Sequence, residues 1–218
     1  KFNWFDDDEW RKIERHLRFI ALTAKKLGCI GLSFDLEPYE KFSENNPWKL
    51  AHWTSAGRGR DEVLLKIYKR SQQMAKAIYE KFPEARIHFY DIGVGNKSVI
   101  QTTLDVKAEN LVGDDYGDVT AYFLAGFASV PSMGKIHIDE ATTYGVYDPA
   151  KINKLYRLAV VKYVDNVIIR WHDESYRSRI RIGLAMMAHV RTKSKKYWDM
   201  VKTLDEARFR DALTVSFK

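Results

Sequence analysis

Cysteine and long apolar runs are what this sequence has least of. Its one cysteine, Cys29, cannot form a disulfide within the chain. No stretch approaches the ~18 consecutive apolar residues of a membrane-spanning helix, so we expect no membrane partner. No signal peptide is recognisable from Lys1 onward, and the sequence therefore predicts no particular cellular compartment.

Several motifs that mark common enzyme classes are missing as well. No G-x-G-x-x-G or G-x-x-x-x-G-K-[ST] loop follows a predicted strand, and the nearest stretch, "DIGVGNKS", has the wrong spacing, which argues against nucleotide binding. No G-x-S-x-G is present, so a nucleophilic serine has little support. H-E-x-x-H is also absent. From the sequence we expect no cofactor and no bound metal.

Acidic residues are outnumbered by basic ones. Lys and Arg total 36 against 29 Asp and Glu, which gives a net charge of +7. The basic residues are spread through predicted helices such as "KIYKRSQQMAKAIYEK", with acids among them. This spread favours a solvated surface, and we expect no nucleic-acid partner, with a polyanion partner as the open alternative. The sequence does not predict an oligomeric state.

Apolar periodicity predicts the order of helices and strands. Apolar residues three or four apart predict helices, and short apolar runs bounded by Gly or Pro predict strands. Helices are expected over residues 7–27, 61–82, 117–130 and 148–164, and strands over residues 29–36, 85–92, 134–141 and 165–174. A further helix is expected after Ser175, and a last strand over residues 211–218.

This alternation predicts repeated parallel βα units, and hence an α/β fold. A β/α (TIM-type) barrel competes with an open doubly wound sheet, and the missing phosphate-binding loop favours the barrel. A whole barrel needs eight strands and about 250 residues, whereas only four strands are firmly predicted here. We therefore predict a single β/α-barrel domain over residues 1–218 that is incomplete at its N-terminus.

Acidic residues lie at the ends of all four predicted strands, in "FDLEPY", "HFYDIG", "HIDEATTYG" and "IRWHDES". Barrel enzymes carry their chemistry at this end of their strands. In the first strand, alternation places Ser33, Asp35 and Glu37 on one face and the apolar residues on the other, toward the helices. Stacked like charges raise one pKa, so Glu37 is predicted as a general acid, with Asp35 orienting it or adjusting its pKa. The alternative is that both acids pair with Arg or Lys across the barrel.

The second carboxylate of the predicted site is Glu140 or Asp139. Alternation points Asp139 inward together with His137 and leaves Glu140 at the rim of the barrel. A retaining glycosidase needs its two carboxyls about 5 Å apart and an inverting one needs more, and the sequence gives no such distance. Both residues therefore stay open as catalytic candidates.

Aromatic and polar residues near the strand ends are predicted to bind substrate. Flat rings stack on the C–H faces of sugars, and arginine binds carboxylates or hydroxyls. The predicted binding residues are Tyr39, Trp48, Trp53, Arg58, Tyr90, Asp91, Tyr144, Arg170 and His172. The alternative for each is a structural role, and Trp48 and Trp53 in particular could pin a long loop.

The stretch "IGLSFDLEP" resembles the D-G-x-D-x-D-x-E strand of the chitinase-like glycoside hydrolases. Gly31, Asp35 and Glu37 fall on the glycine, the last aspartate and the acid glutamate of that motif. Ile30 and Ser33 stand where the motif has its first two aspartates. The first ~40 residues also resemble uncharacterised bacterial proteins regarded as glycosidase-like β/α barrels. The resemblance implies a glycoside hydrolase that cleaves a poly- or oligosaccharide by carboxylate acid/base chemistry at the C-terminal face of the barrel.

Two other functions are compatible with the sequence. Histidines and aspartates share three predicted strands, and together they suit a metal-dependent barrel hydrolase. The residues in question are His88, His137, His172, Asp91, Asp139 and Asp173. A catalytically silent carbohydrate-binding barrel is the second alternative.

Overall fold

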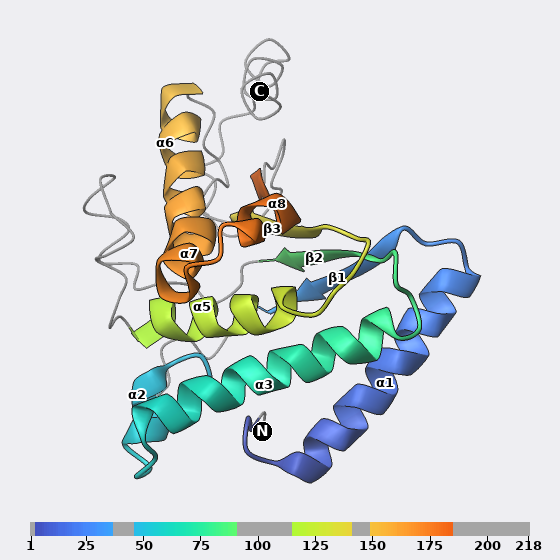
Figure 1. Ribbon diagram of the computed structural model, residues 1–218, viewed down its shortest axis with the longest axis horizontal. Helices are drawn as coiled ribbons and strands as arrows, with labels where there is room; N and C mark the ends of the chain where they lie inside the picture. The colour runs from blue at the N-terminus through green and yellow to red at the C-terminus, as the bar shows by residue number, and fades with distance from the viewer. Residues whose placement is uncertain (1–2, 37–45, 91–114, 141–148, 185–218) are drawn as a thin grey trace, which may run out of the picture.

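A computed structural model describes residues 3–36, 46–90, 115–140 and 149–184 of the chain (Figure 1). The strand predicted over residues 211–218 lies outside these ranges. Among the described residues, no helix is both long enough and apolar enough to span a lipid bilayer.

The described strands form one parallel sheet with the order β1-β2-β3-β4. The strands are β1 (Gly31–Asp35), β2 (Arg86–Tyr90), β3 (Ile136–Glu140) and β4 (Ile180–Leu184). Every neighbouring pair is parallel, and each strand lies beside its successor in the sequence. This confirms the α/β class and the parallel βα units.

Helices fill the connections between the strands. They are α1 (Asp7–Lys26), α2 (Leu50–Thr54), α3 (Arg60–Tyr79), α5 (Asp115–Ala128), α6 (Pro149–Val160), the π-helical turn η3 (Val161–Asp165), α7 (Asn166–Trp171) and α8 (Ser175–Arg179). Helix α3 contacts both α1 and α5, and α5 contacts α7. Figure 1 shows α3 between α1 and α5, with the sheet above α3 in this view.

Local sequence signals explain why α1 begins and ends where it does. The Asp6 carboxylate accepts a hydrogen bond from the backbone N–H of Glu9 at 2.9 Å, which caps the first turn. Acidic residues occupy that turn, and Lys25 and Lys26 lie in the last turn, as the helix dipole favours. The helix was predicted over residues 7–27, and it forms over Asp7–Lys26.

The apolar face of the sheet packs against the helices. Ile87, Phe89, Ile136 and Ile138 are fully buried, and burying each such side chain contributes about 1.5–3 kcal/mol. The ring of Phe89 meets that of Phe127 on α5 edge to face, with centroids 5.0 Å apart. The prediction that the apolar side of the strands faces the helices is confirmed.

The predicted fourth strand, over residues 165–174, is wrong. No Gly or Pro interrupts the chain between Pro149 and Trp171, so the helix continues through η3 into α7. It ends at His172, whose φ of 51° is left-handed. The helix expected after Ser175 forms as α8, and the fourth strand is β4, which follows it. In β4 a buried Ile180 precedes an exposed Arg181, with the period of two that strands have.

Candidate active site

One face of the sheet carries polar side chains from all four strands. Because alternate residues of a strand point to the same side, the register of the sheet brings these side chains into two rows. We call this surface the polar face; its residues, from β1 to β4, are Ser33, His88, His137 and Arg181 in one row, and Asp35, Tyr90, Asp139 and Gly183 in the next row toward the carboxyl ends. The predicted grouping of Ser33 with Asp35 and of His137 with Asp139 agrees with this register.

A hydrogen-bonded chain crosses three strands of the polar face. The hydroxyl of Ser33 lies 2.8 Å from Nδ1 of His88. On the other side of the ring, Nε2 of His88 lies 2.8 Å from Oδ2 of Asp139. An ionised carboxylate can only accept, so Nε2–H donates to Asp139, and in the neutral ring Nδ1 then accepts from the Ser33 hydroxyl. The chain fixes both the orientation and the tautomer of His88.

Gly183 on β4 makes room for the Asp139 carboxylate. A Cβ atom built at Gly183 would overlap Oδ1 of Asp139. The carboxylate is therefore held between two strands, with Oδ2 against His88 on β2 and Oδ1 above the bare backbone of β4. A side chain at position 183 would force this carboxylate to move.

We expect Gly183→Ala to displace Asp139 and to break its contact with His88. The displaced atom belongs to the end of a half-exposed side chain, so the cost in stability should stay within about 1 kcal/mol. Nitrogen-15 spectra of the imidazoles report the tautomer of His88, which should no longer be fixed in the variant. Gly59→Ala is the matched control, because a Cβ there meets only the Glu62 side chain at ordinary van der Waals distance, 3.9 Å. An unchanged His88 signal in Gly183→Ala would contradict this placement.

His137 lies beside this chain and is surrounded by positive charge. Burial is the main cause that lowers its pKa from the usual 6.5; the charge of Arg86 lowers it further, as does His88 when its ring is protonated. Asp139 opposes them by favouring the protonated ring. His137 is therefore a neutral imidazole near pH 7.

This lowered pKa predicts an acid-sensitive contribution to stability. The unfolded chain binds the His137 proton more tightly than the folded chain does, so stability is complete above pH 6.5 and is lost as the pH falls from 6.5 toward the lowered pKa. His137→Gln should lose less free energy of unfolding than the wild type between about pH 7.5 and about pH 5 in urea titrations. His16→Gln, on the exposed side of α1, is the control. Identical pH dependence in wild type and His137→Gln would refute the assignment.

The second row of the polar face places two carboxylates near the carboxyl ends of the strands. Asp35 and Asp139 occupy β1 and β3, with Tyr90 of β2 between them in register. Two interstrand spacings separate their Cα atoms by roughly 10 Å. Asp35 is exposed, and Tyr90 is half-buried. The row thus offers two carboxylates on either side of an aromatic ring.

Several predicted site residues lie outside the described part of the chain. They are Glu37, Tyr39, Asp91 and Tyr144. The backbone of Glu140 ends β3, but its side chain is likewise outside the description. The roles of these five residues stay predictions.

Trp48 and Trp53 do not offer free rings to a substrate. Their side chains are only 6% and 7% exposed, and the Trp53 indole donates to the Pro47 carbonyl at 3.0 Å, as does that of Trp4 at 2.9 Å. This corrects their predicted part in substrate binding and supports the alternative that they pin the loop before α3. The guanidinium of Arg58 is engaged in the same region, 3.6 Å from the Phe5 ring centroid and 2.7 Å from Glu62.

Arg170 and His172 do not end a strand, contrary to the prediction. Arg170 lies on α7, where it pairs with the buried Asp118 of α5 and donates to Asn166 at 2.9 Å. His172 follows α7 and is exposed. The predicted placement of both residues at a strand end is wrong, because residues 166–171 are helical, whereas their part in substrate binding stays a prediction.

Because residues 166–171 are helical, the histidines proposed for the alternative metal site are not all on the sheet. His172 lies on the helix side of the fold, apart from His88 and His137 on the polar face. Within the described ranges, no three His, Cys, Asp or Glu side chains are grouped as a metal site requires.

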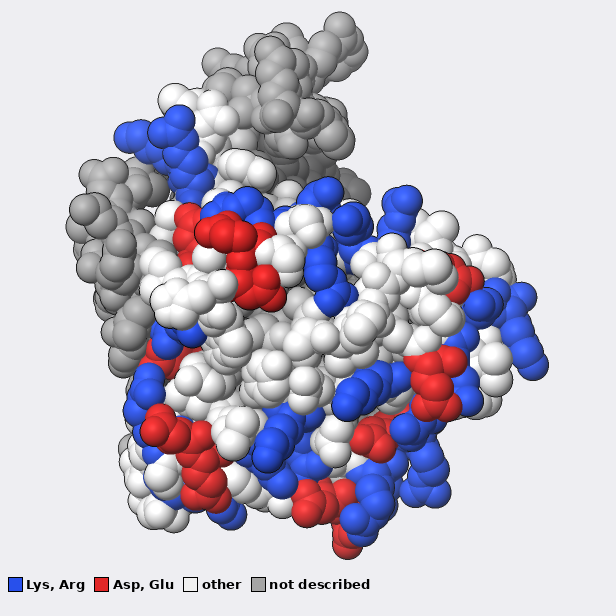
Figure 2. Space-filling model, in the orientation of Figure 1, with Lys and Arg blue, Asp and Glu red and all other residues white. Residues whose placement is uncertain are grey.

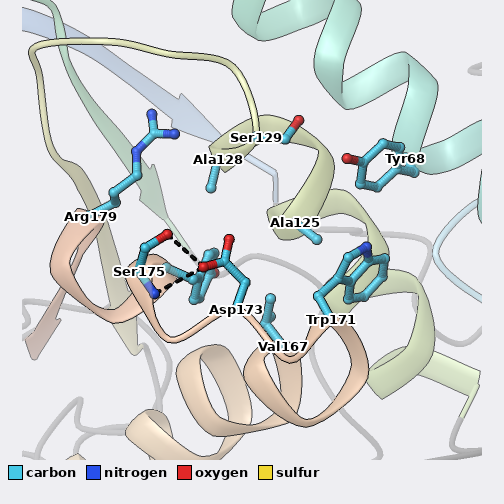
Figure 3. A pocket seen from close by; sticks show the side chains of 10 residues that line it. Tyr68, Ala125, Ala128, Ser129, Val167, Trp171, Asp173, Ser175 and Arg179 are labelled. Carbon is cyan, nitrogen blue, oxygen red and sulfur yellow. Dashed lines mark hydrogen bonds between the residues drawn. The ribbon is translucent and has the colours of Figure 1, made fainter.

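A separate cavity of about 220 Å³ lies among α3, α5, α7 and α8 (Figure 3). The rings of Tyr68 and Trp171 stack against each other on one wall, with centroids 5.9 Å apart. The charged groups of this cavity already have hydrogen-bond partners within the protein. Asp173 accepts two hydrogen bonds from Ser175, and Arg179 donates to the Val130 carbonyl at 2.8 Å. No residue of the polar face lines this cavity. The polar face is therefore the better candidate for chemistry.

Basic side chains on the surface are interspersed with acidic ones. Figure 2 shows both kinds mixed over the lower part of the molecule, where α1 and α3 lie. Ion pairs account for part of this mixture, for example Arg18 with Glu80 at 2.8 Å and Lys25 with Glu84 at 3.0 Å. On this face the charge pattern favours a solvated surface over a polyanion-binding one.

Comparison with known proteins adds no relative. No family model matches the chain, and no curated protein or solved structure matches it either. The resemblance of "IGLSFDLEP" to the chitinase-like glycoside hydrolases therefore stays a prediction, and function is inferred from the polar face.

Proposed function

We propose that the protein hydrolyses glycosidic bonds of a poly- or oligosaccharide at the carboxyl-terminal end of the polar face. The observation that carries the proposal is the row Asp35–Tyr90–Asp139. Glycosidases flank the scissile bond with two carboxyl groups about 5–10 Å apart. In this row two interstrand spacings put the Cα atoms of the two carboxylate residues roughly 10 Å apart, which is compatible with such a pair. The ring of Tyr90 between them suits stacking on a sugar.

Asp35 and Asp139 have different surroundings, and we propose different roles for them. Asp139 accepts from His88 and is thereby oriented, which suits an ionised base or nucleophile. Glu37, two residues beyond the end of β1, is the predicted general acid. Asp35, which is exposed on β1, is the residue that we propose to orient Glu37 or to adjust its pKa.

We also propose that the sheet belongs to a β/α barrel with the polar face toward the barrel axis. In support, the strand order β1-β2-β3-β4 contains no reversal, whereas a doubly wound sheet reverses at its switch point. The buried isoleucines and phenylalanines meet the helices, which leaves the polar rows on the opposite side. Active sites of barrels lie at the strand ends where Asp35 and Asp139 are found.

The test is hydrolysis of a substrate panel by the purified chain. The panel contains chitin, cellulose, xylan and starch oligosaccharides together with aryl glycosides, and new reducing ends are counted. We expect turnover on at least one substrate and a loss of about 10²–10⁴-fold in Glu37→Gln. Glu174→Gln is the matched control, because Glu174 is 76% exposed on the helix side. Absence of turnover on the whole panel, or full activity in Glu37→Gln, would overturn the proposal.

A further inference from the structure

We propose that Ser33 is a nucleophile for acyl groups, with His88 as its base and Asp139 as the residue that orients the base. This activity goes beyond glycoside hydrolysis, which makes no use of Ser33. The substrate class is carboxylic esters small enough to reach an exposed strand residue.

Both hydrogen bonds of a serine–histidine–carboxylate relay are present. Ser33 Oγ to His88 Nδ1 and His88 Nε2 to Asp139 Oδ2 each measure 2.8 Å. The direction of donation is also the required one, because the Asp139 carboxylate fixes the proton on Nε2 and leaves Nδ1 free to take the hydroxyl proton. The arrangement was missed from sequence because its members come from three strands and carry no G-x-S-x-G elbow.

Solvent exposure decreases from the proposed nucleophile to the base and then to the orienting carboxylate. Ser33 is exposed, whereas the side chains of His88 and Asp139 are 35% and 27% exposed. The nucleophile is thus open to a substrate while the orienting carboxylate is the most covered of the three. Gly183 completes the support, since only a residue without a side chain leaves the Asp139 carboxylate in place.

A cation is available for the negative charge that develops on the carbonyl oxygen. Arg86 pairs with Gly31 in the register, on the same face as Ser33 and two residues before His88. Diagonal neighbours of this kind have Cβ atoms about 7–8 Å apart, which the long arginine side chain can span. Its positive charge already acts on the polar face, where it helps to lower the pKa of His137.

The proposed ester hydrolysis needs no reactant other than the ester and water. His88 Nδ1 takes the Ser33 proton as Oγ forms a bond to the ester carbonyl carbon, and the tetrahedral intermediate collapses with cleavage of the C–O bond. The leaving alcohol receives the proton from His88. Water, deprotonated by His88 in its turn, then cleaves the acyl–serine ester to release the carboxylic acid and restore Ser33.

Covalent labelling of the full chain with a fluorophosphonate probe tests this inference. We expect one adduct at Ser33 by peptide mass spectrometry, none in Ser33→Ala, and labelling about 10²–10⁴-fold slower in His88→Gln. Ser175 is the internal control, because it also donates to a carboxylate, that of Asp173 at 2.6 Å, and should stay unlabelled.

A second readout covers the case in which His88→Gln does not fold. Labelling of the wild type should slow as the pH falls, because protonated imidazole cannot accept the serine proton. An unlabelled Ser33, or labelling that ignores both His88 and pH, would overturn the inference. Such a result leaves the proposed glycoside hydrolysis untouched, since labelling of Ser33 is measured without any glycoside.

Discussion

Asp139→Asn is expected to lower kcat for glycoside hydrolysis by about 10²–10⁴-fold without unfolding the protein. Asparagine keeps the size of the side chain but cannot serve as base or nucleophile. The contact with His88 is half-exposed, with 35% and 27% of the two side chains accessible, so its loss should cost no more than about 1 kcal/mol. Steady-state kinetics and a urea titration of the same preparation separate the two effects.

Asp8→Asn is the control for this variant. Asp8 is 75% exposed, and its ion pair with Arg11 lies on the surface of α1. Its replacement should leave kcat within about twofold, as is usual for an exposed pair remote from a site. If Asp139→Asn kept full kcat, or if it lost stability and activity in parallel, Asp139 would have a structural role only.

Asp118→Ala is expected to reduce the free energy of unfolding by about 3 kcal/mol or more. The side chain of Asp118 is fully buried on α5 and pairs with Arg60 of α3 and with Arg170 of α7. Arg170 is itself only 9% exposed, so removal of the carboxylate takes a buried ion pair from its guanidinium. The ion pairs that link α5 to α3 and to α7 through this carboxylate are both lost.

A second partner of Arg60 provides the matched control for Asp118. Asp61 also pairs with Arg60, at 3.4 Å, but it is 95% exposed. Asp61→Ala should therefore cost less than about 1 kcal/mol in the same urea titration. Replacing Arg170 by methionine in the Asp118→Ala background should restore part of the loss, as a double-mutant cycle would show. Equal effects of Asp118→Ala and Asp61→Ala would contradict the network.

Local signals explain how much of the fold could be predicted. The cap at Asp6 and the stop at Pro83 bracket helices whose apolar residues repeat every three or four positions. The first three strands follow directly from short apolar runs. The fourth failed because "VIIRW" is apolar, short and without Gly or Pro, and such a run cannot be distinguished from a buried helical segment by periodicity.

The sequence predicted which residues of a strand share a face, but it did not predict which residues of neighbouring strands are in contact. Alternation places Ser33 with Asp35 and His137 with Asp139 from the sequence alone. The contact between His88 and Asp139 depends on the register of β2 against β3, which no local signal specifies.

Burial by distant segments was equally invisible in the sequence. Trp48 and Trp53 looked available for sugars, but Trp48 meets the ring of Trp4 edge to face, and Pro47 accepts from Trp4 and Trp53. Nothing in the sequence singled out Gly183 either. Its role is to leave space for the Asp139 carboxylate, which lies on the neighbouring strand.

Histidine NMR tests most directly whether the polar face binds carbohydrate. Two of the six histidines, His88 and His137, lie on the polar face, while His16 lies on α1 and His172 lies next to Trp171 and Asp173 of the interhelical cavity. The Asp35→Asn variant, titrated with each oligosaccharide of the panel, should show shifts of the His88 and His137 ring signals and none at His16 or His172. Shifts at His172 alone, or no shift with any oligosaccharide, would contradict a carbohydrate site on this face.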